Sequence, residues 1–152
     1  MERSKVWRRP RLSTQILLLQ VAIIVLTVGV GVAVVQARRQ LDKQAGENSL
    51  AIARAVASLD TVVEAFDDAD PAKTINPIAE GIRTKTRAAF IVVANREGIR
   101  YSHPNPDQIG ERVSTDPSVA LSGREYIGSQ EGTLGDSVRA KVPVRNDDGR
   151  II

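Results

Sequence analysis

The sequence predicts an α+β domain that follows an N-terminal transmembrane helix. Three observations predict this class: an uncharged apolar stretch near the N-terminus, a proline-free region rich in helix-forming residues, and a series of short apolar runs separated by turn residues. Helices that precede a run of antiparallel strands cover one face of the sheet. We therefore expect a long helix, a short helix and an antiparallel sheet of about five strands.

The apolar stretch lies between Ile16 and Val35 and carries no charge. About 20 such residues span the hydrocarbon core of a bilayer as a helix. Five basic residues precede the stretch, against Glu2 alone, and by the positive-inside rule they hold the N-terminus in the cytoplasm. We expect a cytoplasmic N-terminus at 1–15, a transmembrane helix at 16–36 and an extracytoplasmic domain at 37–152.

A cleaved signal peptide is the competing interpretation of the apolar stretch. Val35, Gln36 and Ala37 fit a small-x-small cleavage site. The apolar region of a typical signal peptide is about 7 to 15 residues long, and this stretch is longer. The length favours an uncleaved membrane anchor.

Charge and composition exclude several classes of function. The chain of 152 residues has a net charge of +3, but residues 38–152 carry 16 basic and 17 acidic side chains. The basic excess therefore belongs to the membrane topology and gives no argument for binding nucleic acid. There is no cysteine for disulfides or thiolate chemistry, and one histidine cannot build a common zinc site. We expect no metal.

Two helices are predicted before the strands. Arg38–Phe66 lacks proline and is rich in Ala, Gln, Glu and Leu, so it predicts a helix that continues from the membrane segment. Pro71–Ile82 predicts a second, shorter helix. Five apolar residues of the first helix form one stripe: Ile52, Val56, Leu59, Val63 and Phe66. This stripe fits packing against the core of the domain or a two-stranded dimer seam, and both can hold on different faces.

The pattern becomes that of strands after Lys85. Ala88–Ala94 is a continuous apolar run, typical of a buried strand, and a turn leads from it into Ile99–His103. A loop follows, with a short helix in DPSVALSG. The next strands and the hairpin turn after them are predicted at Arg124–Gln130, Ser137–Val144 and Asn146–Gly149. After Arg150–Ile152 the sequence ends where we expect a further strand to begin.

Four potentially cationic side chains are expected to converge on one face of this sheet. Arg100 and His103 end one strand, while Arg139 and Lys141 alternate onto the same face of another. Guanidinium groups bind carboxylates in bidentate fashion, and an ammonium adds a point charge. Such a cluster fits a small molecule with several carboxylates. Nucleophilic catalysis by His103 would need an activated serine and an orienting acid, and since Ser102 alternates to the other face we expect no catalytic residue.

The stretches RYSHPNPDQIG and GTLGDSVRAKVPVRNDDGRII resemble the sensor domain of the citrate and C4-dicarboxylate family of bacterial membrane histidine kinases. The resemblance runs from the anchor helix to Ile152 and implies an extracytoplasmic PAS-like domain between two transmembrane helices. It also implies the ligand-binding residues: Arg100, His103, Arg139, Lys141, Gly132, Thr133 and Leu134.

Within that resemblance each matched residue has an expected role. Arg100, His103 and Arg139 contact the carboxylates of the ligand, and Lys141 matches the lysine of citrate-type members. The loop of Gly132, Thr133 and Leu134 matches one whose backbone and hydroxyl groups hold the ligand. The chain departs from citrate sensors in having Val92 where they have a threonine, which removes a hydroxyl donor. Citrate stays favoured, with a C4-dicarboxylate next.

The resemblance sets the expected function and its alternatives. We expect the sensory input region of a homodimeric two-component sensor histidine kinase in the bacterial plasma membrane, which binds an external di- or tricarboxylate. The final strand, second membrane helix and cytoplasmic domains of the family are missing from this sequence, so the response regulator and ATP concern only those domains. This chain needs no cofactor. The alternatives are the sensor module of a chemoreceptor or other non-kinase receptor, and a nonfunctional truncated remnant.

Overall fold

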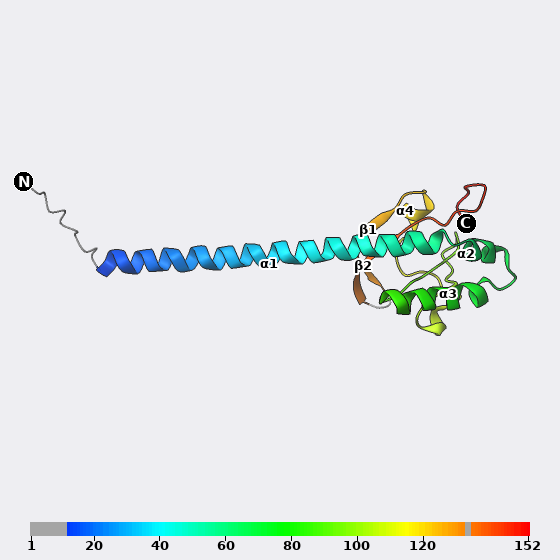
Figure 1. Cartoon of the computed structure of the whole chain (residues 1–152), viewed down its shortest axis with the longest axis horizontal. Coiled ribbons are helices and arrows are strands. Elements are labelled where there is room, and N and C mark those ends of the chain that lie inside the picture. The colour runs from blue at the N-terminus through cyan, green and yellow to red at the C-terminus, as the bar shows by residue number, and fades with distance from the viewer. Residues whose placement is uncertain (1–11, 133–134) are drawn as a thin grey trace, which may run out of the picture. The chain divides into compact units, whose positions relative to one another are not determined.

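The computed structural model describes residues 12–132 and 135–152 (Figure 1). The chain divides into two compact units, the first ending at Leu41 and the second spanning Asp42–Ile152. Helix α1 covers Leu12–Ala57, so its residues from Asp42 onward belong to the second unit. In the first unit its side chains are exposed from residue 14 to residue 41. By its length and composition, α1 qualifies as a helix that could cross a membrane.

The first predicted helix ends earlier than expected. Instead of continuing to Phe66, α1 stops at Ala57 and is followed by α2 at Asp60–Glu64 and a 3-10 turn at Ala65–Asp67. Leu59 has an extended backbone, with φ −76° and ψ 118°. The hydroxyl of Ser58 donates to the carbonyl of Ala55 at 3.1 Å, a local bond that competes with helix propagation. The break redirects the chain so that Leu59 and Phe66 still pack against the core.

Helix α3 spans Pro71–Thr86, about one turn longer than predicted. Pro71 occupies the first turn, where the missing N–H costs nothing. The helix ends at Arg87, which has a left-handed backbone with φ 58°, and the N–H of Ala88 returns to the carbonyl of Arg83 at 3.1 Å.

The core lies between these helices and the segment that follows α3. Its buried residues are Val56, Val62, Ala65, Ile75, Ala79, Ile91 and Val93. Ile52, Leu59 and Phe66 pack against them, so the predicted apolar stripe packs against the core of its own domain. The alternative, a dimer seam, stays a prediction for the other faces of the helix.

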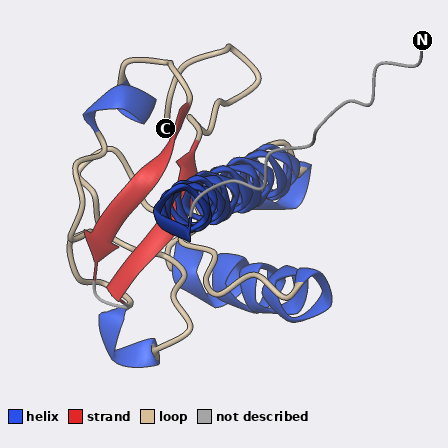
Figure 2. Cartoon of the chain, turned by 90° about the vertical axis from the view of Figure 1, so that its left-hand side faces the viewer, coloured by secondary structure: helices blue, strands red, loops and turns tan. Residues whose placement is uncertain are grey.

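The regular sheet is a two-stranded antiparallel pair, β1 at Tyr126–Gly132 and β2 at Gly135–Lys141. α3 and the last turns of α1 lie to one side of it (Figure 2). Gly46 of α1 lies so close to this pair that an added Cβ would be 2.6 Å from Cγ2 of Ile127. The predicted short helix is present as α4, Ser118–Leu121. The α+β class is confirmed.

The predicted count of about five strands is wrong for the described residues. The segments 88–94 and 99–103 are hydrogen-bonded to each other, but the one bridge between these two described segments joins Ala94 and Arg100. Ser102, which is fully buried, lies where this pairing is irregular. Its hydroxyl accepts from the N–H of Val93 at 2.8 Å and donates to the carbonyl of Ile91 at 3.1 Å. The serine side chain thereby takes backbone groups that a regular ladder would pair.

The predicted hairpin turn is present at the C-terminal end of the described chain. Arg145 and Ile151 form an antiparallel bridge, and the N–H of Ile152 donates to the carbonyl of Val144 at 3.1 Å. The turn between Arg145 and Ile151 is rich in Asn, Asp and Gly, and Gly149 has a left-handed backbone with φ 76°. The chain therefore reverses direction beside the end of β2.

Candidate functional site

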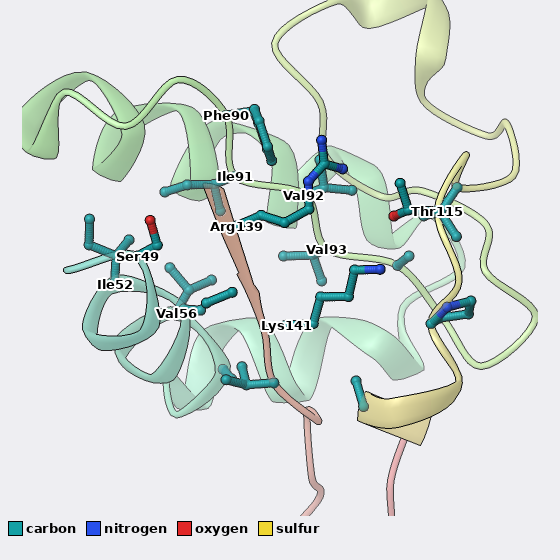
Figure 3. Close-up of a pocket in the computed structure, with 18 of the residues that line it drawn as sticks. Ser49, Ile52, Val56, Phe90, Ile91, Val92, Val93, Thr115, Arg139 and Lys141 are labelled. Carbon is teal, nitrogen blue, oxygen red and sulfur yellow. The ribbon is translucent and has the colours of Figure 1, made fainter. Parts of the chain in front are cut away.

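A cavity of about 420 Å³ lies within the second unit (Figure 3). Its walls come from the last turns of α1, the extended segment after α3, the loop before α4, and β2. All four predicted basic residues line it: Arg100, His103, Arg139 and Lys141. Cavities of this size commonly hold small molecules.

Arg139 lies on β2, opposite Gly128 of β1. Its Nη2 donates to the carbonyl of Gln130 at 2.9 Å and to the hydroxyl of Ser137 at 2.6 Å. Its Nε is buried, and among the described residues it has no hydrogen-bond partner. Burial lowers the pKa of Arg139, against the opposing influence of Tyr126. The guanidinium is thus held in place and partly desolvated.

Lys141 follows two residues later and leaves β2 on the same side as Arg139 (Figure 3). Its Nζ donates to the backbone carbonyl of Asp116 at 2.5 Å and lies 5.6 Å from the centroid of the Tyr126 ring. Burial and the charge of Arg139 lower the pKa of Lys141, while Asp116 raises it. Gly128 makes room for that ring, because an added Cβ would lie 2.7 Å from Cζ of Tyr126.

Arg100 is deeply buried, with 3% of its surface exposed. Its backbone is fixed on both sides, since its N–H donates to Glu111 at 3.0 Å and its carbonyl accepts from Gly110 at 2.9 Å. Its Nη1 donates to Oε1 of Gln108 at 3.2 Å. A neutral amide is a weak partner for a buried guanidinium, so the charge of Arg100 stays available to an anion.

His103 is as deeply buried as Arg100. Its Nδ1 lies 3.0 Å from the backbone nitrogen of Asn105, which donates to it, and 3.1 Å from the carbonyl oxygen of the same residue. Burial is the main cause that lowers the pKa of His103; the charge of Arg100 lowers it further, while the Asn105 carbonyl and Glu80 oppose the shift. The imidazole can therefore accept from Asn105 when neutral and donate to it when protonated.

The cavity is positively charged and suited to an anion. Among the residues whose side chains the structure describes, which leaves out Asp136, no carboxylate lies within 4.0 Å of the side-chain nitrogens of Arg100, Arg139 or Lys141. The ion pairs that do form lie elsewhere. Within residues 12–132 and 135–152 there is also no group of acidic, histidine or cysteine side chains placed to hold a metal. The arrangement can bind and orient carboxylates, since two guanidiniums, an ammonium and an imidazole face one space.

The remaining predicted site residues are Gly132, Thr133 and Leu134, which we expected to form a loop that holds the ligand. Gly132 is the last residue of β1 and pairs with Gly135. Thr133 and Leu134 lie outside the described residues. The predicted contact of this loop with the ligand therefore stays a prediction.

Several residues of the cavity wall, among them Ser49 and Thr115, were not predicted from the sequence. Ser49 lies three residues before Ile52 on α1, and continuing the apolar stripe by one step would have found it (Figure 3). Thr115 lies in a loop without periodicity, so no pattern points to it. Val92, where the expected threonine is absent, also lines the cavity.

Comparison with known proteins gives a consistent result. The profile of the single cache domain 3 family matches residues 36–152. The sensor protein CitS of Halalkalibacterium halodurans is 48% identical over 119 residues, which cover 77% of this chain and 22% of CitS. The sensor histidine kinase CitA of Klebsiella pneumoniae is 30% identical over 115 residues, which cover 74% of this chain and 21% of CitA. The chain thus spans about a fifth of the length of these two relatives.

A solved structure supports the fold. The crystal structure of the Escherichia coli DcuS sensor domain superposes with a TM-score of 0.68 at 28% sequence identity. The match covers 73% of this chain and 84% of that one.

Proposed function

Because the chain belongs to the single cache domain 3 family, we propose that it is the sensory input region of a membrane-bound two-component sensor histidine kinase. Its relatives confirm the resemblance to the citrate and C4-dicarboxylate sensor kinases. The kinase activity, ATP and the response regulator belong, in this proposal, to parts of a protein longer than these 152 residues. The chain itself uses no cofactor.

The proposed ligand is a small di- or tricarboxylate, with citrate ahead of a C4-dicarboxylate. The observation that carries this proposal is the shared cavity of Arg100, His103, Arg139 and Lys141. No carboxylate whose side chain the structure describes is paired to the arginines or the lysine. Buried charges are costly unless they are paired, so an anionic ligand would supply the missing counter-charge. Lys141 supports a third carboxylate and hence citrate, whereas Val92 offers no hydroxyl donor.

The proposed signal passes from the cavity to α1. Ser49, Ile52 and Val56 of α1 line the cavity that β2 closes from another side. Arg54 of the same helix donates to the carboxylate of Glu125 at 2.7 Å and 2.5 Å, which ties α1 to the residue just before β1. A ligand that draws the basic side chains together would shift the balance between two packings of these elements.

The proposed setting is the bacterial plasma membrane. The N-terminus lies in the cytoplasm, α1 crosses the membrane, and the sensor domain lies outside as part of a homodimer. The basic residues before the apolar stretch support this orientation.

The test is thermal unfolding of the full chain in detergent micelles, alone and with citrate, malate or succinate. A ligand that binds only the native state stabilises it by about 2.7 kcal/mol at 100 times its dissociation constant. Glycerol, which has hydroxyls but no charge, is the negative control. A shift with citrate supports a tricarboxylate sensor, and a shift with malate or succinate alone supports the C4-dicarboxylate branch. If none of the three acids shifts the transition, the proposed ligand class is wrong.

A further inference from the structure

Helix α3 contributes a contact to the site although Asn76, the residue that makes it, does not line the cavity. The backbone N–H of His103 donates to Oδ1 of Asn76 at 3.2 Å. The two residues are 27 positions apart in the sequence. This bond therefore joins the helix layer directly to the segment that carries Arg100 and His103.

The hydrogen bond between His103 and Asn76 forms where the backbone pairing of the two segments ends. Ser102 takes the N–H of Val93 and the carbonyl of Ile91 with its side chain, so the chain leaves the ladder just before His103. A buried backbone N–H needs an acceptor, because leaving it without one costs free energy comparable to a lost hydrogen bond. Asn76 supplies that acceptor from a neighbouring element.

Asn76 is itself firmly anchored. Ile75 before it is fully buried, and Ala79 one turn later is 1% exposed. Pro77 follows directly and has a fixed φ. The backbone at Asn76 therefore has little freedom, and its side chain reaches the segment of His103 from a well-fixed position on the helix.

The ring of His103 is held from the other direction by Asn105, at 3.0 Å and 3.1 Å from Nδ1. One asparagine thus fixes the main chain of His103 and the other fixes its ring plane. Loss of the Asn76 acceptor would let the backbone of His103 rotate, which would turn the imidazole relative to Arg100.

Resting on the proposed function, we propose that Asn76 is a positioning residue of the carboxylate site, which fixes the main chain of His103 so that its imidazole meets the ligand. Asn76 does not touch the ligand. It sets the direction of a residue that does.

The test uses the one histidine of the chain as a reporter. Because these 152 residues contain a single His, the imidazole signals of the histidine-labelled chain in micelles belong to His103 without assignment. Two variants of similar size separate the acceptor from the packing: Asn76→Leu removes the oxygen, and Asn76→Asp keeps it. Asn146→Ala is the matched control, because Asn146 accepts from the N–H of Arg150 at 2.9 Å in a turn that does not line the cavity.

We expect Asn76→Leu to move the imidazole signal and its titration midpoint, and to weaken binding of citrate or succinate about threefold to tenfold, as for one lost hydrogen bond. Asn76→Asp should keep the ring orientation, but its added negative charge should raise the titration midpoint of His103 and weaken binding of the acids. Asn146→Ala should change neither the imidazole signal nor the affinity. An unchanged imidazole signal and titration in folded Asn76→Leu would overturn the proposal. If Asn76→Leu does not fold, Asn76→Ala takes its place, and an unchanged imidazole signal and titration in that variant overturn the proposal instead. Failure of the wild type to bind either acid contradicts the proposed function, and the imidazole signal still reports whether Asn76 holds His103.

Discussion

The guanidinium of Arg139 lies over the ring of Phe90, with 5.1 Å between its central carbon and the ring centroid. The contact joins β2 to the extended segment after α3, and both elements line the cavity. A cation over an aromatic face is stabilised without losing its charge. Phe90 therefore keeps Arg139 in place while leaving its positive charge available to an anion.

Arg139→Ala should nearly abolish carboxylate binding. The change removes a desolvated charge-assisted contact, for which we expect a loss of about 2 to 5 kcal/mol of binding free energy. Arg139→Lys keeps the charge but loses the planar fork, so it should bind more weakly than the wild type and more strongly than Arg139→Ala. Calorimetric titration with citrate or succinate measures both.

Arg150→Ala is the matched control for this series. The Arg150 side chain is 75% exposed, pairs with Asp148 and does not line the cavity. The affinity of Arg150→Ala for citrate or succinate should equal that of the wild type. Unchanged binding by Arg139→Ala would remove Arg139 from the site.

Stability of the unliganded protein should fall as the pH is lowered from about 7.5 to 5.5. The pKa of His103 in the folded chain lies below its ordinary value, mainly because of burial, so the unfolded chain binds the proton more readily. The neutral imidazole stabilises the fold fully above the unfolded pKa of about 6.5, and this contribution is lost as the pH falls below that value. Thermal unfolding across this range measures the slope.

His103→Gln is the control, because it removes the titration while keeping a polar side chain. The stability of His103→Gln should change less with pH in this range than the stability of the wild type does. A carboxylate ligand should act in the opposite sense, since it favours the imidazolium, so the stabilisation by ligand should grow toward pH 5.5. Identical slopes in the two proteins would show that His103 does not cause the pH dependence.

Gly128→Ala should weaken ligand binding while leaving the fold intact. The added methyl would overlap the ring of Tyr126, which is the end of a side chain and can rotate away. Lys141 would then lose the ring that lies 5.6 Å from its ammonium. We expect lower affinity for citrate, from an ammonium that is no longer held beside Arg139.

Gly81→Ala is the control for that substitution. Gly81 is exposed on α3 with no atom within 4 Å of an added Cβ, so alanine should stabilise the helix by up to about 1 kcal/mol and leave binding unchanged. Wild-type affinity in Gly128→Ala would mean that the Tyr126 ring does not hold Lys141 for the ligand.

Much of this architecture could be predicted from local patterns. Both strands of the β1–β2 pair, the turn before Arg150 and the stripe around Val56 follow from periodicity and turn residues. The alternation of Arg139 and Lys141 also placed them on one face, as the structure has them. These features depend on neighbours in the sequence.

The features that could not be predicted depend on contacts between distant segments. Helix α1 ends at Ala57 and the chain turns at Leu59 to pack on the core, a contact with distant residues that the periodicity of the sequence does not mark. Ser102 was expected on a regular strand, yet its hydroxyl replaces backbone pairing with a segment nine to eleven residues away. Asn76 showed no signal at all, because its partner is 27 residues away.

Ser102→Ala should destabilise the domain more than an exposed serine substitution does. The Ser102 hydroxyl satisfies the N–H of Val93 and the carbonyl of Ile91, and alanine would leave both groups buried without it. An unsatisfied buried group costs about 1 to 3 kcal/mol, and this range is the expected loss in free energy of unfolding. Chemical denaturation of the full chain in micelles measures this loss.

Ser58→Ala is the control. The Ser58 hydroxyl is exposed and donates to the carbonyl of Ala55, so the substitution should change the free energy of unfolding only slightly. Equal stability of the two variants would show that backbone pairing closes around residue 102 once the hydroxyl is gone, and that the serine does not cause the break in the ladder.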